Sequence, residues 1–331
     1  MTCETVLEVN NLSTCFRTRH GEVRAVSGVS FKLAAGQTLG LVGESGCGKT
    51  VTALSLVGLV DPPGEVYAGE VLFGGQNLLE LNKKQLREIR GQEIAFVFQD
   101  PLTSLNPVLS VGTQMIETIL AHRKMSREMA RQRAVELLGS VGLPDPEKML
   151  HRYPFQLSGG MRQRVMIAMA FSLQPRILIA DEPTTALDVT VQAQILNEMK
   201  RLKREFGTAI ILITHDLGVV AELADIVAVM YAGSIVEMGS IADIFINPAH
   251  PYTQALLRSV PRLSHGNIHL EPVKGQPPSL LNLPDRCAFL PRCPQSKPVC
   301  AVEKPQLQEV GSNHKVACHC AVPVLQEAVF A

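Results

Sequence analysis

The chain has 331 residues, enough for one large or two small domains with a buried core. Its 31 Lys and Arg residues balance 31 Asp and Glu residues, so the overall charge gives no electrostatic reason to expect a nucleic-acid partner. No apolar run reaches the roughly 18 residues that span a bilayer, and the N-terminus lacks the features of a secretory signal, which favours a soluble or peripheral protein in the cytosol.

Short apolar segments alternate with helix-like stretches along the chain. This alternation is typical of an α/β protein built around a largely parallel sheet. The expected strands are residues 6–9, 39–42, 71–73, 94–98, 177–180, 209–213 and 226–231.

A glycine-rich loop follows the second expected strand, and residues 51–59 after it are apolar enough to form a helix. The loop reads G-x-x-x-x-G-K-T, which is typical of a phosphate-binding loop (P-loop), whose backbone N–H groups surround a phosphate. We expect Lys49 to reach the β and γ phosphates and Thr50 to ligate Mg²⁺, so the loop predicts a nucleotide site. Its residues are Gly43, Glu44, Ser45, Gly46, Cys47, Gly48, Lys49 and Thr50.

The segment between residues 107 and 150 has a helical pattern. Apolar residues recur at three-to-four spacing in 111–122 and 127–141, with no strand candidate between them. We therefore predict a helical subdomain inserted at approximately 101–165. The amphipathic stretch 111–120 is either ordinary core packing or a contact with a membrane partner.

Two carboxylates end the apolar strand expected at 177–180. Asp181 and Glu182 would lie at the carboxyl edge of the sheet, where α/β proteins bind ligands. We predict that Asp181 belongs to the Mg²⁺ shell and that Glu182 orients or deprotonates an attacking water.

The run Leu157-Ser158-Gly159-Gly160-Met161-Arg162-Gln163-Arg164 resembles the signature of ABC-type ATPases, and it precedes the acidic strand as in that family. Met161 departs from the Gln that is most common there, but Ser158, Gly159 and Gly160, which would contact phosphate, are retained. The resemblance implies an ABC-type P-loop ATPase core that binds ATP and Mg²⁺.

The same resemblance implies roles for further residues. Phe16 would stack on adenine, although an aromatic residue there could also belong to the core. Gln99 would link the γ-phosphate and Mg²⁺ to a transport partner, and His215 would contact the γ-phosphate. Asp188 would end a dimer-communication loop, Ala186-Leu187-Asp188. Since the P-loop of one subunit faces the signature of another in this family, the chain is expected to work as a dimer.

Two longer segments narrow the resemblance. Gln99 to Pro107 and Asn247 to Leu257 resemble the ATPase subunits of dipeptide, oligopeptide and nickel importers, and the tail is most similar to the "D" subunits for dipeptides and oligopeptides. This implies a second homologous ATPase subunit, two permeases, an extracytoplasmic substrate-binding protein and no nucleic acid. The protein would be peripheral, on the cytoplasmic face of the inner membrane.

The expected domains are an ABC ATPase domain at 1–246 and a Pro/Cys-rich C-terminal extension at 247–331. Peptide and nickel or another small solute remain alternative cargoes. A more distant alternative is a soluble ABC ATPase of ribosome recycling or DNA repair, but the second ATPase unit, coiled coil or nucleic-acid module typical of those proteins is not visible in this sequence.

Cysteines recur in this tail as C-x₅-C-x₆-C-x₁₇-C, formed by Cys287, Cys293, Cys300 and Cys318. By ligand type, four thiolates suit a [4Fe–4S] cluster or tetrahedral zinc equally well. Cys320 is an alternative fourth ligand, and His319 is a further candidate. The family resemblance implies the iron–sulfur cluster, with a structural or regulatory role.

Overall fold

The computed structural model describes residues 4–100, 104–184, 188–259 and 272–321. The chain forms two compact units. Unit 1 contains residues up to Leu7, Leu33–Thr38 and Asn77–Ile213, and unit 2 contains Glu8–Lys32, Leu39–Gln76 and the residues from Thr214 onward. The chain passes between the units several times, so neither unit is a continuous half of the sequence.

Unit 1 contains three adjacent parallel strands in the order β6-β7-β8. Their bounds are Ile94–Val97, Ile177–Asp181 and Ala209–Ile213. Every residue of β7 and β8 is buried, which explains why both read as continuous apolar runs rather than as alternating patterns. Asp181 is therefore the last residue of a fully buried strand.

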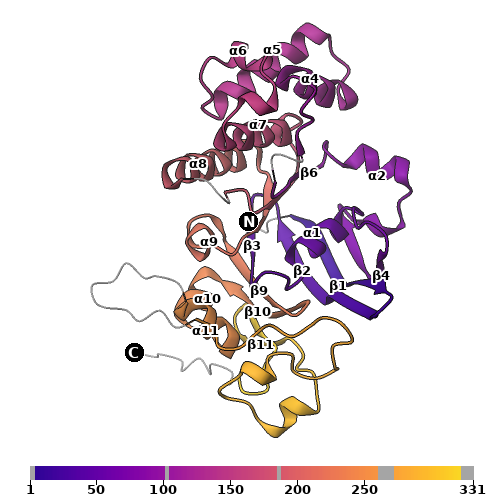
Figure 1. Ribbon diagram of the computed structural model, residues 1–331, viewed down its shortest axis with the longest axis vertical. Helices are drawn as coiled ribbons and strands as arrows, with labels where there is room; N and C mark the ends of the chain where they lie inside the picture. Colours follow the sequence, from indigo (N-terminus) through magenta and orange to yellow (C-terminus); the bar gives the residue numbers. More distant parts are fainter. Residues whose placement is uncertain (1–3, 101–103, 185–187, 260–271, 322–331) are drawn as a thin grey trace. The chain divides into compact units, whose positions relative to one another are not determined.

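The helices between β6 and β7 gather into one bundle within unit 1 (Figure 1). Ser110, Ser126 and Ser158 cap three of them, each accepting a hydrogen bond from the backbone N–H of the third helical residue. The bundle consists of α4 (Val111–His122), α5 (Arg127–Ser140), α6 (Pro146–Leu150) and α7 (Gly159–Phe171). Unit 1 also has α2 (Lys83–Ile89), α8 (Val189–Phe206) and the short 3₁₀ turns Leu78–Glu80 and Pro154–Gln156.

Unit 2 contains the strand order β2-β1-β4-β5 in one sheet and β11-β12-β10-β9-β3 in another. β3 and β9 are parallel, whereas β9, β10, β12 and β11 are joined by antiparallel pairing. Apart from a few terminal residues that belong to unit 1, these strands are β1 (Thr5–Thr18), β2 (Gly21–Ala34), β3 (Thr38–Val42), β4 (Gly64–Phe73), β5 (Gln76–Asn77), β9 (Ile226–Tyr231), β10 (Ser234–Ser240), β11 (Gln308–Gly311) and β12 (His314–Val316).

The helices of unit 2 are α1 (Lys49–Leu56), α9 (Leu217–Leu223), α10 (Ile241–Ile246) and α11 (Pro251–Arg258), with 3₁₀ turns at Leu290–Arg292 and Pro298–Ala301. An apolar core connects β9, α9 and α11 with the C-terminal segment, which we define as residues 272–321. Three aromatic residues, Tyr231, Tyr252 and Phe289, are fully buried in this core. The C-terminal segment is therefore anchored in the same core as the last strands of the sheet.

Several expected elements are confirmed. The strands at 209–213 and 226–231 and the helix at 111–122 have the predicted bounds, and the helix expected at 127–141 ends one residue earlier. The first strand is much longer than residues 6–9, and β2 and β10 were not predicted because polar residues interrupt their apolar pattern.

In the described part of the chain, no helix combines the length and apolar character needed to cross a bilayer.

Candidate nucleotide-binding site

The predicted P-loop connects β3 to α1 within unit 2. Lys49, the first residue of α1, is almost fully buried, and its Nζ donates hydrogen bonds to the carbonyl oxygens of Gly43 (2.8 Å) and Glu44 (3.0 Å). The ammonium group is thus held against the loop by neutral acceptors. A phosphate would offer it a charged acceptor, which makes a stronger hydrogen bond, so the loop fits a nucleotide phosphate.

Close backbone packing explains why glycines occupy two positions of the loop. Gly48 has φ of 105°, and a Cβ built there would lie 2.2 Å from the carbonyl oxygen of Ala25. Gly43 has φ of 152°, and its Cβ would lie 2.3 Å from the carbonyl oxygen of Met230. The strands beside the loop therefore leave no space for a side chain at either position. The loop leads into the N-terminus of α1, the end of a helix that attracts anions.

The predicted acidic pair lies in unit 1, at the carboxyl end of β7. Asp181 is buried, whereas Glu182 is half-buried and has φ of 46°. The backbone N–H of Glu182 donates to the carbonyl oxygen of Ile213 (2.8 Å), and Nε2 of Gln99 donates to Oε2 of Glu182 (2.9 Å). The structure therefore brings together two of the three predicted catalytic side chains, Gln99 and Glu182. Of the segment that begins at Gln99, residues 101–103 lie outside the described residues.

The signature-like run forms the start of α7. Ser158 is its N-cap, and the Ser158 hydroxyl accepts a hydrogen bond from the backbone N–H of Met161 (3.3 Å). Ser158 and Gly159 are exposed, and a Cβ at Gly159 would meet nothing within 4 Å. Since Met161 contributes only its backbone to the cap, the unusual side chain does not disturb this helix start.

The remaining predicted residues lie at the ends of strands and helices. Asp188 is the N-cap of α8 and accepts from the N–H of Val191 (2.9 Å), while Ala186 and Leu187 lie outside the described residues. His215 is exposed in the turn between β8 and α9. Phe16 on β1 is half-buried beside Gly64, where a Cβ would meet the ring at 2.6 Å. The part of the ring that remains exposed is compatible with a base or with ordinary packing.

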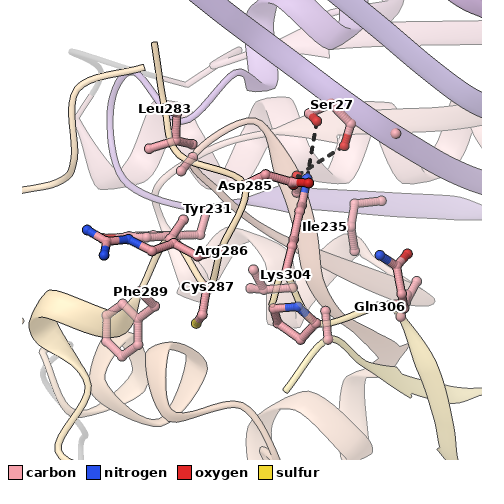
Figure 2. A pocket seen from close by; sticks show the side chains of 18 of the residues that line it. Ser27, Tyr231, Ile235, Leu283, Asp285, Arg286, Cys287, Phe289, Lys304 and Gln306 are labelled. Carbon is pink, nitrogen blue, oxygen red and sulfur yellow. Dashed lines mark hydrogen bonds between the residues drawn. The ribbon is translucent and has the colours of Figure 1, made fainter. Parts of the chain in front are cut away.

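A cavity of about 710 Å³ lies elsewhere in unit 2 and was not expected from the sequence (Figure 2). Lys304 points into it and donates to the hydroxyls of Ser27 (3.2 Å) and Ser234 (3.1 Å). Burial lowers the pKa of the Lys304 ammonium, and the nearby Asp285 carboxylate partly opposes this effect. No P-loop residue lines the cavity, but Tyr231 does, so one wall belongs to the aromatic core.

The predicted iron–sulfur cluster is wrong. Within the described residues, no group of three or more His, Cys, Asp and Glu side chains is arranged to hold a metal ion, which overturns the metal set Cys287, Cys293, Cys300 and Cys318 and its zinc alternative. Cys287 and Cys293 instead pack against the apolar core, and burial raises the pKa of both thiols. Their environment therefore favours the neutral thiol, whereas a metal requires the thiolate.

The other candidate ligands are engaged by protein groups. Cys300 accepts a hydrogen bond at Sγ from the N–H of Lys297 (3.5 Å), and Cys318 accepts from the N–H of Cys320 (3.3 Å). The Cys320 thiol donates to the carbonyl oxygen of Gln295 (3.0 Å). His319 lies with Nε2 3.1 Å from the carbonyl oxygen of Glu303. The cysteines of the C-terminal segment thus contribute to packing and local hydrogen bonding.

Three features define an ABC-type ATPase: a P-loop, a strand that ends at Asp181 and is followed by Glu182, and a serine-capped helix between them in sequence. Two family models agree: one described as ABC transporter matches residues 26–185, and one described as oligopeptide/dipeptide transporter, C-terminal region, matches residues 236–300. The fold also resembles solved cassettes. The dimeric, post-hydrolysis structure of the ATP-binding cassette MJ0796 bound to ADP and Pi has a TM-score of 0.65 and 28% identity, over 71% of this chain and 98% of that one.

Similarity to curated proteins extends along nearly the whole chain. The dipeptide transport ATP-binding protein DppD of Bacillus subtilis (strain 168) is 52% identical over 95% of this chain and 94% of its own length. The oligopeptide transport ATP-binding protein OppD of Salmonella typhimurium (strain LT2) is 49% identical over 95% of this chain and 93% of its own length. The chain therefore belongs to the family of ABC transporter ATP-binding proteins that includes the dipeptide and oligopeptide transport subunits. As an ABC ATPase, it binds ATP with Mg²⁺.

Proposed function

We propose that ATP hydrolysis by this chain drives the import of dipeptides or oligopeptides through a membrane ABC transporter. The main support is the match of residues 236–300 to the C-terminal region of oligopeptide and dipeptide transporters, in addition to the match of the ATPase region. The relatives with such names are 48–52% identical over nearly their full length. We also propose that residues 1–246 are the ATPase domain and that 247–331 form a Pro/Cys-rich extension specific to these importers.

We propose that the working assembly contains a second homologous ATPase subunit, two permeases and an extracytoplasmic substrate-binding protein, with this chain peripheral on the cytoplasmic face of the inner membrane. The sequence has one P-loop and one signature-like run, so two complete sites require two such subunits. The dimeric state of the MJ0796 cassette supports the pairing. Closure of the ATPase pair on ATP, followed by hydrolysis and reopening, would transmit force to the permeases.

In the mechanism that we propose, Glu182 orients a water molecule and accepts its proton as the water oxygen attacks the γ-phosphorus. The bond from the γ-phosphorus to the oxygen of ADP breaks, leaving ADP and phosphate. The hydrogen bond from Gln99 to Oε2 of Glu182 fixes the direction of the carboxylate. His215 would hold the γ-phosphate, and Ser158, Gly159 and Gly160 would contact phosphate across the dimer interface.

Lys49 and the N–H groups of the P-loop would bind the phosphates, and Phe16 would stack on adenine. Bound Mg²⁺ supplies positive charge that offsets the charge of the phosphates. The Thr50 hydroxyl and the Asp181 carboxylate are the hard oxygen ligands that this ion prefers. Asp188 would begin α8 at the dimer-communication loop, with its carboxylate engaged in the cap.

The test is uptake of labelled dipeptides and tetrapeptides by cells that lack this chain and carry it on a plasmid. We expect the plasmid to restore uptake and Glu182→Gln to fail although the protein accumulates normally. A tagged chain purified from native membranes should carry two permeases and a second ATPase. Unchanged peptide uptake in the deletion strain, combined with loss of nickel uptake, would replace the proposed cargo. Co-purification of ribosomes or DNA-bound proteins would reject the transport role.

A further inference from the structure

The side chain of Glu44, the second residue of the P-loop, is bound by the C-terminal segment of the same unit. Nη1 of Arg292 donates to Oε2 of Glu44 (2.6 Å), and Nη2 donates to Oε1 (2.9 Å). The Arg292 side chain is only 3% exposed. The contact is therefore a bidentate ion pair between a buried guanidinium group and a carboxylate that is 25% exposed, a geometry that fixes direction as well as distance.

The guanidinium group of Arg292 also donates hydrogen bonds to three groups other than Glu44. Its Nε donates to the carbonyl oxygen of Lys274 (2.9 Å), Nη2 to that of Val273 (3.1 Å) and Nη1 to the Tyr231 hydroxyl (3.3 Å). Together with the two bonds to Glu44, these occupy all five N–H donors of the guanidinium group. The Glu44 carboxylate is the main reason that the pKa of Arg292 is raised. A lysine could not reproduce this set of contacts, because it lacks the planar fork.

The main chain of Glu44 has a second anchor in the same core. The backbone N–H of Glu44 donates to the Tyr252 hydroxyl (2.9 Å), and the Tyr252 ring is fully buried against Tyr231 and Phe289. The carbonyl oxygen of Glu44 accepts one of the hydrogen bonds from Lys49. One P-loop residue is thus linked through its N–H, carboxylate and carbonyl groups to α11, the C-terminal segment and the phosphate-binding lysine.

Charge adds a second reason for the contact with Arg292. A carboxylate in a phosphate-binding loop repels an anionic ligand. Pairing with the buried guanidinium offsets that charge and turns the carboxylate toward the protein. Without Arg292, Glu44 would be a free negative charge beside the phosphates, and the start of the loop would have to be ordered when nucleotide binds.

We propose that Arg292 and Tyr252 are positioning residues of the nucleotide site, which fix Glu44 and thereby set the affinity of this chain for ATP. The C-terminal region then acts on the P-loop directly, in addition to any role with transport partners. The proposal depends on nucleotide binding by this loop and not on the nature of the cargo, so binding of ATP to the purified wild-type chain tests that assumption separately from peptide import.

The experiment is a titration of the purified full-length chain with a fluorescent ATP analogue, accompanied by urea unfolding of each variant. The variants are Arg292→Gln, Glu44→Gln, the double variant and Tyr252→Phe. Arg286→Gln is the matched control, because this exposed arginine lies six residues earlier and makes no side-chain hydrogen bond or ion pair to the described residues.

We expect Arg292→Gln to weaken ATP binding by about tenfold and Tyr252→Phe by about threefold, with no change in Arg286→Gln. The double variant should bind ATP better than Arg292→Gln, because removing the Glu44 charge removes the repulsion. A merely structural role for Arg292 predicts no such rescue. Wild-type affinity in folded Arg292→Gln, or losses that add in the double variant, would overturn the proposal. If Arg292→Gln does not fold, wild-type affinity in both Glu44→Gln and Tyr252→Phe would overturn it.

Discussion

Nε2 of His314 lies 2.8 Å from Oε1 of Glu237, and both side chains are buried in unit 2. The same carboxylate accepts hydrogen bonds from the backbone N–H groups of Ala249 (2.6 Å) and His250 (3.0 Å). Glu237 on β10 therefore connects the turn before α11 with β12 of the C-terminal segment. All three donors to this buried carboxylate come from later in the chain, so Glu237 holds those later segments against β10.

Glu237→Gln should destabilise the protein by about 1–3 kcal/mol, because an amide cannot supply all the acceptors that the carboxylate offers to three donors. Urea unfolding measures the change. Glu309→Gln is the control, since Glu309 is exposed on β11 and pairs weakly with Lys315 at 3.8 Å. Equal stability of the two variants would show that the Glu237 contacts contribute little.

His250 should make the fold sensitive to mild acid. Burial lowers the pKa of His250 from 6.5 to about 4, and its Nδ1 accepts the N–H of Tyr252 (3.0 Å) at the start of α11. The unfolded chain therefore takes up a proton that the folded chain excludes. This contribution to stability is complete above pH 6.5 and is lost as the pH falls toward 4, with a slope of at most about 1.4 kcal/mol per pH unit.

The measurement is the urea midpoint of the wild-type chain and of His250→Asn at several pH values between 7.5 and 4.5, a range chosen to bracket the usual pKa of histidine, about 6.5. Asparagine can still cap α11 but does not titrate. We expect a shallower pH dependence in His250→Asn. Parallel curves for the two proteins would assign the acid sensitivity to other groups.

Glu182→Gln should bind ATP with normal affinity and hydrolyse it at least about 100-fold more slowly, because the amide cannot accept the proton of the attacking water. Phosphate release and ATP titration separate the two effects. Glu136→Gln, an exposed change on α5, is the control. Near-normal turnover in Glu182→Gln would remove this residue from the catalytic mechanism.

Gly48→Ala should weaken ATP binding at least about tenfold, since the added methyl group would collide with a backbone carbonyl and force the P-loop to move. Gly28→Ala is the control, because it adds backbone strain without a collision. Gly28 also has positive φ, at 70°, but a Cβ there would meet nothing within 4 Å. Comparable loss of ATP binding in both variants would mean that conformational strain alone explains the result.

Met161→Gln should change ATP turnover by no more than about twofold, because the backbone N–H of residue 161 makes the contact with Ser158 and either side chain leaves it intact. Ser158→Ala, which removes the cap, should reduce turnover and destabilise α7 by about 1 kcal/mol. The steady-state ATPase rate of the assembled transporter is the appropriate measurement. A large gain in Met161→Gln would show that the methionine side chain limits the reaction.

The sequence was most informative where function depends on neighbouring residues. The P-loop, the acids at the end of β7 and the signature-like run at the start of α7 are local patterns, so chemical roles could be predicted for them before the fold was known. Contacts between distant segments could not. Nothing in the residues near Glu237 or Glu44 indicates the distant partners that they contact in the structure.

For the cysteines, the sequence led to the prediction of a site that the structure does not contain among the described residues. Ligand type and the family resemblance predicted a shared metal, but neither reveals whether the thiols converge or pack separately. In the described segment, burial and backbone hydrogen bonds account for them individually. The C-terminal segment has little apolar content with which to form a large core of its own. Only the structure shows that Phe289 packs into the core of unit 2.

The ion pair between Glu44 and Arg292 joins residues 248 positions apart. During synthesis, the ribosome therefore produces the phosphate loop 248 residues before its guanidinium partner. A nascent or prematurely released chain therefore carries an unsupported loop with an unneutralised carboxylate. On the proposal that Arg292 positions Glu44, a chain released before residue 292 would bind nucleotide weakly and compete poorly for the cell's ATP.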